Sequence, residues 1–297
     1  MYADDTTLMT NLRISEMSDL NTLFLKINSE LEYINEWLKV NKLSLNVTKS
    51  KYMVFHMPQR NVPDFQLLID ETPIEKTICF NFLGIMVQQN LSWDSHVNRI
   101  ALKISRTIGI INKLKHFVPL NVLLTLYNSL VLPHMNYGLL IWGHRSERIF
   151  KLQKKAVRII SQSKYNSHSE PIFKTLKLLQ IQDIYKLQQL KIIHKIINKS
   201  IPKYFETMNL IFFHDIHTHN TRHKNTALVP KIKHAFARNC IRYDMPRIMN
   251  NTSLCIVNKI TTHSLYGYGQ YIKKGMIESY SVICSILNCY ICNRNNI

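Results

Sequence analysis

Two adjacent carboxylates, Asp4 and Asp5, follow Tyr2 and Ala3 near the start of the 297-residue sequence. Carboxylate oxygens are ligands that Mg²⁺ prefers, and the ion usually keeps waters or substrate phosphates in the rest of its shell. A pair of such ions holds the attacking and leaving oxygens during phosphoryl transfer. Because Tyr and Thr favour strands and an Asp-Asp pair suits a tight turn, residues 1–10 are predicted to form a β-hairpin with both carboxylates at its tip. Taken alone, such a dipeptide is more often an ordinary surface turn.

Basic side chains recur at helical spacing on two later segments of the chain. The first set is Arg99, Lys103, Arg106 and Lys113, and the second set is Lys151, Lys154, Lys155 and Arg158. A basic helix face can follow a phosphate backbone through contacts that do not depend on base sequence. The alternative is a basic face that is merely solvated.

The charge of the chain points to a polyanionic partner. The sequence holds 38 Lys and Arg against 19 Asp and Glu, a formal net charge of +19. Residues 1–60 contain equal numbers of basic and acidic side chains, so the excess lies after residue 60. We expect nucleic acid as the partner rather than membrane, because no basic amphipathic anchor and no apolar run of roughly 20 residues is present.

The elements that must position these groups change type near residue 90. Apolar residues recur at steps of three and four over residues 18–40, which predicts one amphipathic helix. The alternating second half of residues 43–55 predicts a strand. Short apolar runs separated by turn residues over 61–92 predict two or three further short strands.

After residue 91 the pattern becomes helical. Asp94 is predicted to cap a helix whose core stripe is Val97, Ile100, Ala101, Ile104, Ile108 and Ile111. A second helix is predicted from Pro119 to Leu132, where Pro133 should end it. The remaining helices are predicted around residues 149–160, from Pro171 and over residues 181–199.

Tyr2-Ala3-Asp4-Asp5 resembles the polymerase metal-binding motif of reverse transcriptases, in the non-LTR retrotransposon (LINE, jockey-like) branch. Five later segments resemble the same family in the same order, and the resemblance covers about residues 1–280. These segments are Asn46 to Ser50, Phe82-Leu83-Gly84-Ile85, Pro133-His134-Met135-Asn136-Tyr137-Gly138 with Trp142-Gly143, Leu152 to Ile160, and Tyr266 to Tyr280.

The resemblance implies a role for each matching residue. Asp4 and Asp5 would be the catalytic Mg²⁺ ligands, and Lys49 would be the general acid that protonates the leaving pyrophosphate. A surface lysine in a turn is the alternative for Lys49. Residues that would contact the primer end or the nucleotide are Tyr2, Phe82, Leu83 and Gly84. Tyr137 and Trp142 of the third segment are expected to bury their rings.

The fold class expected is α+β: part of a reverse-transcriptase palm, with short antiparallel strands and one long helix, followed by a mainly α-helical region. The domains expected are the C-terminal part of the palm over 1–90, a helical thumb-like domain over 91–205, a C-terminal region over 206–280 and a tail over 281–297. In this family a further metal-binding aspartate precedes the motif. We therefore expect a fragment that begins in mid-palm, lacks the fingers and the first part of the palm, and is inactive alone.

The complete enzyme would carry out Mg²⁺-dependent nucleotidyl transfer, adding deoxynucleotides to a DNA primer on an RNA template. A competing interpretation is a non-catalytic, nucleic-acid-binding remnant of a decayed mobile element. The non-functional product of such an element is a third.

Histidines and cysteines give no convincing metal site in the sequence. His214, His217 and His219 lack a completing thiol or carboxylate, and Cys289-x-x-Cys292 lacks the other ligands of a zinc knuckle. The six cysteines form no compact disulfide framework, and no signal peptide is visible. We expect an intracellular protein, nuclear or cytoplasmic, that is neither secreted nor membrane-bound.

Overall fold

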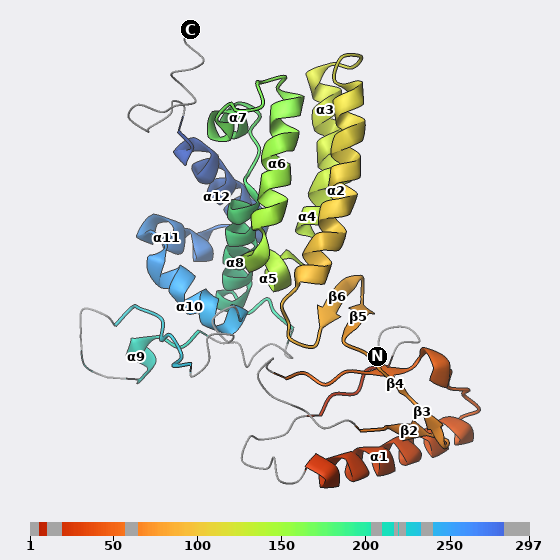
Figure 1. The fold of residues 1–297 in the computed structure, drawn as a ribbon. Helices are drawn as coiled ribbons and strands as arrows, with labels where there is room; N and C mark the ends of the chain where they lie inside the picture. Colours follow the sequence, from red (N-terminus) through yellow and green to blue (C-terminus); the bar gives the residue numbers. More distant parts are fainter. Residues whose placement is uncertain are drawn as a thin grey trace. The chain divides into compact units, whose positions relative to one another are not determined.

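The computed structural model describes residues 6–10, 20–56, 65–202, 210–216, 219, 224–232 and 240–281 (Figure 1). The chain divides into two compact units, Met1–Ser92 (unit 1) and Trp93–Ile297 (unit 2). Short strands lie in unit 1, and helices make up most of unit 2. The expected fold class, α+β with a largely helical later part, is confirmed.

Helix α1 (Leu20–Val40) confirms the helix predicted over residues 18–40. Its apolar face packs against a small buried cluster formed by Leu67, Ile69 and Ile74. A polar side chain joins the same two segments, because Asn28 Oδ1 accepts a hydrogen bond from the backbone N–H of Leu68 at 3.1 Å. The helix therefore holds the first strands of the following segment by both apolar and polar contacts.

The described strands of unit 1 are β1 (Lys51–Tyr52), β2 (Leu68–Ile69), β3 (Thr72–Pro73), β4 (Glu75–Lys76), β5 (Cys79–Phe82) and β6 (Ile85–Gln88). They form three two-stranded sheets. The pairs β2–β3 and β5–β6 are antiparallel as expected, whereas β1 and β4 pair in parallel. Residues 65–92 hold β2 to β6, more strands than predicted, because Asp70 and Glu71 both take positive φ and reverse the chain between β2 and β3.

The predicted hairpin over residues 1–10 is not found in its described half. Residues 6–10 belong to no strand of the described chain. Residues 1–5, with Tyr2, Asp4 and Asp5, lie outside the described residues. The strand predicted within residues 43–55 is reduced to β1, because Lys51 and Tyr52 alone of these residues pair with a described strand, β4.

Unit 2 is built from helices of very different lengths. They are α2 (Asp94–Leu114), α3 (Leu120–Leu126), α4 (Leu132–Asn136), α5 (Leu139–Trp142), α6 (Glu147–Ile160), α7 (Ser169–Thr175), α8 (Ile181–Ile197), α9 (Phe213–Ile216), α10 (Ile241–Asn251), α11 (Leu254–Thr262) and α12 (Leu265–Ser279). Helices α2 and α6 run side by side, and α8 lies between α6 and the group α10 to α12 (Figure 1). The core contains the fully buried rings of Tyr127, Trp142, Phe173 and Tyr268.

Helix α2 begins without the predicted side-chain cap. Asp94 is its first residue, and Trp93 occupies the cap position with a left-handed backbone, φ 63° and ψ 4°. The Trp93 ring packs against the core, which fixes the direction in which the chain enters the helix. The stripe predicted for this helix is confirmed, since all its members are buried: Val97, Ile100, Ala101, Ile104, Ile108 and Ile111.

The helix predicted to end at Pro133 continues to Asn136. A π-helical segment, η3 (Tyr127–Val131), joins α3 to α4, and the N–H of Leu132 donates to the carbonyl of Tyr127, five residues earlier. Proline normally breaks a helix because its ring clashes with the preceding turn and it donates no hydrogen bond. The π turn directly before Pro133 is wider than an α turn, so it leaves room for the proline ring and tolerates the missing N–H donor.

Tyr280, the residue directly after α12, is hydrogen-bonded to residues of α7, of α8 and of the segment between them. The Tyr280 hydroxyl donates to the Asp183 carboxylate and accepts from the backbone N–H of Gln180 at 3.0 Å. Lys174 Nζ donates to the Tyr280 carbonyl at 2.6 Å. Burial, followed by the contact with Asp183, raises the pKa of Tyr280, so its hydroxyl stays protonated. These bonds close unit 2 across about a hundred residues of sequence.

Candidate nucleic-acid interface

Helix α2 presents a basic stripe opposite its buried stripe. Its four members, Arg99, Lys103, Arg106 and Lys113, are all exposed. Their separations of four, three and seven residues place them on one side of the helix. Asp94, in the first turn, is the only acid in α2. The predicted basic face of this helix is therefore present in the fold.

Helix α6 carries the second basic set in two different settings. Lys151 and Lys155 are exposed, whereas Lys154 and Arg158 are half-buried. Lys154 Nζ lies 4.6 Å from the centre of the Phe150 ring, a cation–π contact. Arg158 Nε donates to the Ser167 carbonyl at 2.7 Å. Burial lowers the pKa of the Arg158 guanidinium, but arginine remains charged in proteins.

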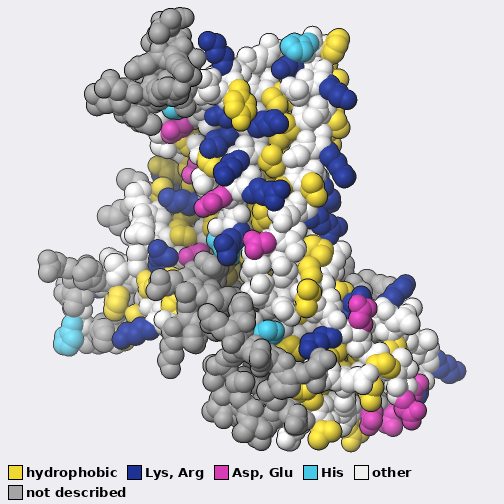
Figure 2. All heavy atoms as spheres, in the orientation of Figure 1, with side chains coloured by type: hydrophobic (Ala, Val, Ile, Leu, Met, Phe, Trp, Pro, Cys, Tyr) yellow, Lys and Arg dark blue, Asp and Glu magenta, His cyan; other side chains and the backbone are white. Residues whose placement is uncertain are grey.

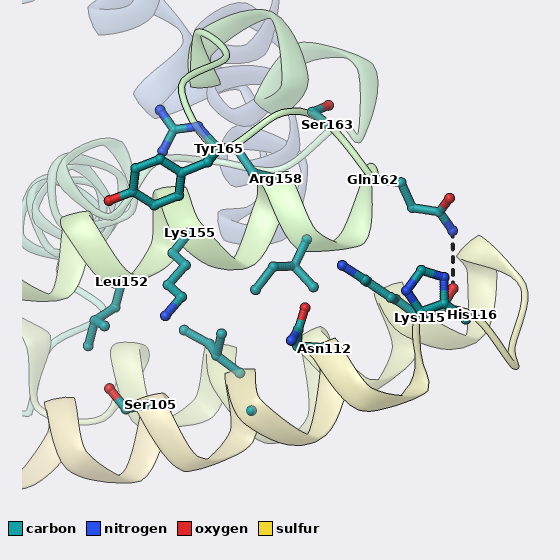
Figure 3. Close-up of a pocket in the computed structure, with 13 residues that line it drawn as sticks. Ser105, Asn112, Lys115, His116, Leu152, Lys155, Arg158, Gln162, Ser163 and Tyr165 are labelled. Atoms are coloured by element: carbon teal, nitrogen blue, oxygen red, sulfur yellow. Dashed lines mark hydrogen bonds between the residues drawn. The ribbon is translucent and has the colours of Figure 1, made fainter.

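A groove of about 530 Å³ lies between α2, α6 and the loop that follows α6 (Figure 3). Lys155 and Arg158 line it from α6, and Lys115 and His116 line it from the segment directly after α2. Tyr165 lines it from the loop. The sequence predicted two of these residues and missed three, because Lys115, His116 and Tyr165 fall where helical periodicity has ended.

The basic stripe of α2 does not line this groove. The residues of α2 that line it are Ser105, Ile108, Gly109 and Asn112. The structure thus brings together Lys155 and Arg158 with Lys115, and it places the stripe on a neighbouring side of α2. Figure 2 shows Lys and Arg side chains, in dark blue, gathered over the part of unit 2 where Figure 1 draws α6 and α2.

Hydrogen bonds hold the loop that forms one wall of the groove. Gln162 Nε2 donates to the Lys115 carbonyl at 3.1 Å, which joins the loop to the end of α2 (Figure 3). The backbone N–H of Ser163 donates to the Arg158 carbonyl at 3.0 Å. With the bond from Arg158 to Ser167, both ends of the loop are tied to a helix. The groove is therefore formed before any ligand binds.

The lowered pKa values of two imidazoles, His96 and His134, reflect the positive charge around α2. Burial lowers the pKa of His96, and the neighbouring Arg99 and Lys103 lower it further. Burial and Lys103 together lower the pKa of His134. The cations of the basic stripe therefore disfavour additional positive charge nearby, and the same field attracts anions.

Lys49, Leu83 and Gly84, which have predicted roles in unit 1, lie in turns. Lys49 is exposed at the end of a 3₁₀ turn, η2 (Val47–Lys49), whose start Asn46 caps by accepting from the Lys49 N–H at 3.2 Å. Leu83 and Gly84 form the β5–β6 turn, both at positive φ, 46° and 81°. That pair of angles defines a tight hairpin in which glycine is favoured at the second position.

The exposed side chains of this turn are Phe82 and Leu83, about 40% exposed each. Their predicted contact with a primer end or nucleotide, and the predicted acid role of Lys49, remain predictions. Tyr2, Asp4 and Asp5, the other residues with predicted roles in unit 1, lie outside the described residues.

The segment Pro133 to Gly138 has a structural role in unit 2. Trp142 is fully buried as expected, and its Nε1 donates to the Tyr137 carbonyl at 3.0 Å. The expectation that Tyr137 buries its ring is wrong, because the residue is 55% exposed. Helix α4 ends here, and Tyr137 follows it with an extended backbone, ψ 118°.

Other candidate sites contribute no metal centre to the described chain. His214 Nε2 lies 3.3 Å from Asp215 Oδ1, while His217, Cys289 and Cys292 lie outside the described residues. Among the residues that the structure describes, no three His, Cys, Asp or Glu side chains gather into a group that could hold a metal ion. No described helix is both long and apolar enough to cross a membrane.

Comparison with known proteins supports the resemblance at a coarse level. The chain is 24% identical over 161 residues to a probable RNA-directed DNA polymerase from transposon X-element of Drosophila melanogaster. It is distantly related to a transposon reverse transcriptase. The match covers 50% of this chain and 17% of that protein. No family model matches the chain, and no solved structure matches it.

Proposed function

We propose that the chain is part of an RNA-directed DNA polymerase of the non-LTR retrotransposon kind, and that unit 2 holds the nucleic acid. The observation that carries the proposal is the shared basic surface of α2 and α6. Each helix has one acidic residue, Asp94 or Glu147, in its first turn and none later. Eight cations along two adjacent helices are suited to a polyanion that extends along them.

Contacts of this kind are made to phosphates and carry no base information. Every phosphate neutralised by Lys or Arg releases condensed counterions, so affinity depends steeply on salt. We therefore infer that unit 2 binds RNA, DNA or their hybrid without sequence preference. Template RNA and primer DNA are the partners that the distant relationship supports.

Unit 1 is proposed to supply catalytic groups of the same enzyme. Asp4 and Asp5 offer carboxylate oxygens, the donor type that fits Mg²⁺. When bound, Mg²⁺ would supply the positive charge that favours attack of a primer 3′-hydroxyl on the α-phosphate of a deoxynucleotide. Lys49, exposed on a short turn that Asn46 fixes, would give a proton to the leaving pyrophosphate.

A non-catalytic nucleic-acid-binding protein is the second candidate. It is favoured by the core of unit 2, which is built from residues from Trp93 onward and includes both basic helices. Such a protein would bind nucleic acid as unit 2 is proposed to do, without the chemistry of unit 1. Primer extension that Asp4→Ala abolishes would exclude this second candidate, whereas binding without extension is expected of both.

The test of binding is a fluorescence titration of the full chain with labelled RNA, DNA and hybrid at several salt concentrations. If the surface contacts about four to six phosphates, the log–log salt slope is about 3 to 5. Replacing Arg99, Lys103 and Arg106 with Ala should lower that slope by about 2 to 3 and weaken all sequences equally.

A matched triple variant controls for net charge. Lys26 on α1 and Lys273 and Lys274 on α12 are exposed residues that belong to neither α2 nor α6, and their replacement by Ala removes the same charge. This variant should keep the wild-type slope. An affinity independent of salt, or equal slopes for the two triple variants, would exclude the proposed surface.

A further inference from the structure

An aromatic ring distinguishes the α2–α6 groove from the rest of the basic surface. Tyr165 is 85% exposed and lies at the rim of the groove. Figure 3 shows its ring beside the Arg158 guanidinium at one end, with Lys115 and His116 at the other. Lys155 extends from α6 into the space between the two helices. Cations and an uncovered ring therefore border the same hollow.

This combination matches the way proteins hold unpaired nucleotides. Such sites pair a positive groove, which follows the backbone, with aromatic rings on which bases stack. Stacking needs a base whose face is uncovered, and the bases of a duplex cover one another. Small-molecule sites occupy about 300 to 1,000 Å³, so a groove of about 530 Å³ has room for roughly one or two nucleotides.

The residues around Tyr165 are fixed in advance. Arg158 is held by the Ser167 carbonyl, and Gln162 joins the loop to the end of α2. The backbone N–H of Ser167 donates to the Lys164 carbonyl at 3.0 Å, which closes a turn around Tyr165. A loop tied on both sides of the ring reduces the entropy lost when a ligand binds.

We propose that this groove binds a single-stranded polynucleotide, with a backbone phosphate against Lys155 and Arg158 and an unpaired base stacked on Tyr165. The inference rests on the proposed function of the basic surface and narrows it. The α2 stripe contacts phosphates of duplex and single strand alike. The groove adds a preference for the strand with exposed bases.

The test titrates the full chain with a labelled single-stranded RNA, the same sequence as single-stranded DNA, and an RNA–DNA duplex of equal length. Tyr165→Ala should weaken binding of both single strands roughly 5- to 100-fold and leave duplex binding unchanged. Tyr165→Phe should retain the wild-type affinity, because stacking needs the ring and not the hydroxyl. A fluorescent base analogue in the strand should be quenched by the wild type and not by Tyr165→Ala.

Tyr266→Ala is the matched control, since Tyr266 is 76% exposed on α12 and does not line the groove. It should change no affinity. Salt-sensitive binding that is equal for duplex and single strand, and insensitive to Tyr165→Ala, overturns this inference and leaves the proposed function intact. Loss of all salt-sensitive binding by the folded wild type overturns both. Circular dichroism of each variant confirms that its helices are retained.

Discussion

Gln153 is a buried polar residue at the centre of unit 2. Its Nε2 donates to the Tyr127 hydroxyl at 2.9 Å and to the Leu179 carbonyl at 2.8 Å, while its Oε1 accepts from the Ile181 N–H at 2.9 Å. One side chain thus provides hydrogen-bond partners for the start of α8 and for the hydroxyl of Tyr127. Burial raises the pKa of Tyr127 to about 12. Sequence reasoning did not identify it, because a glutamine on a basic helix is typical of a surface residue.

Replacing Gln153 with Leu should destabilise the protein by about 2 to 4 kcal/mol, since buried polar partners would be left without hydrogen bonds. Gln182→Leu, an exposed position on α8, should change stability by less than about 0.5 kcal/mol. Urea denaturation followed by circular dichroism measures both. Equal midpoints for the two variants would contradict the role assigned to Gln153.

The His96 imidazole should make the protein less stable in mild acid. Burial, with Arg99 and Lys103, lowers its folded-state pKa below the ordinary value of 6.5. The unfolded chain therefore binds a proton that the folded chain excludes. Stability from this group is present above the unfolded pKa and is lost as pH falls towards the folded pKa.

Thermal melts between about pH 7 and pH 5 should show this loss, and His96→Gln should reduce it. The His134 pKa is lowered in the same direction, so part of the loss should remain. His116→Gln, an exposed position just after α2, is the control and should leave the profile as it is. If His96→Gln leaves the acid limb unchanged, the imidazole is not its source.

At the scale of elements, apolar spacing predicted the long helices well. Both α1 and α2 were predicted, because apolar residues at steps of three and four are typical of an amphipathic helix. The ends of elements were less predictable. Pro133 should stop a helix on local grounds, yet the π segment before it lets the helix continue. That segment depends on tertiary packing around buried Tyr127 and Val131, which no local pattern specifies.

The turn between α4 and α5 depends on one glycine. Gly138 has φ 61°, a left-handed conformation that costs other residues about 1 to 2 kcal/mol. Gly138→Ala should therefore destabilise the protein by about that amount. Gly109→Ala should do the opposite, by about 0.5 to 1 kcal/mol, because a Cβ there meets nothing within 4 Å and alanine favours the helix. Chemical denaturation of both variants checks the signs, and a shared sign would contradict the different roles assigned to the two glycines.

At the scale of the molecule, the sequence predicted a β-containing first part, a helical second part and a basic surface on two helices. It did not predict the groove. Lys155 and Arg158 stood out by spacing, but Tyr165 and Lys115 gain their places from a loop that Gln162 ties to α2. Contacts between residues about fifty positions apart cannot be predicted from the periodicity of a sequence.

The purified 297-residue chain is expected not to extend a primer. We propose that Asp4 and Asp5 need a further carboxylate to hold a pair of metal ions, because two adjacent carboxylates fill only part of the coordination shells. Incorporation of labelled deoxynucleotides on a primed RNA template, with Mg²⁺ present, is the measurement. Binding of the same primer–template verifies that the preparation is competent. Incorporation that Asp4→Ala abolishes would overturn the expectation.

The fastening of Tyr280 has a consequence for synthesis of the protein. A ribosome releases Gln180 about a hundred residues before Tyr280. Because synthesis proceeds at about 5 to 20 residues per second, roughly 5 to 20 s pass before Tyr280 is available to make these hydrogen bonds. During that interval Phe173, whose ring meets Tyr280 edge to face, lacks this neighbour. The uncovered apolar surface can be bound by chaperones or can lead to aggregation. Slower translation of residues 181–280 should therefore lower the yield of folded protein.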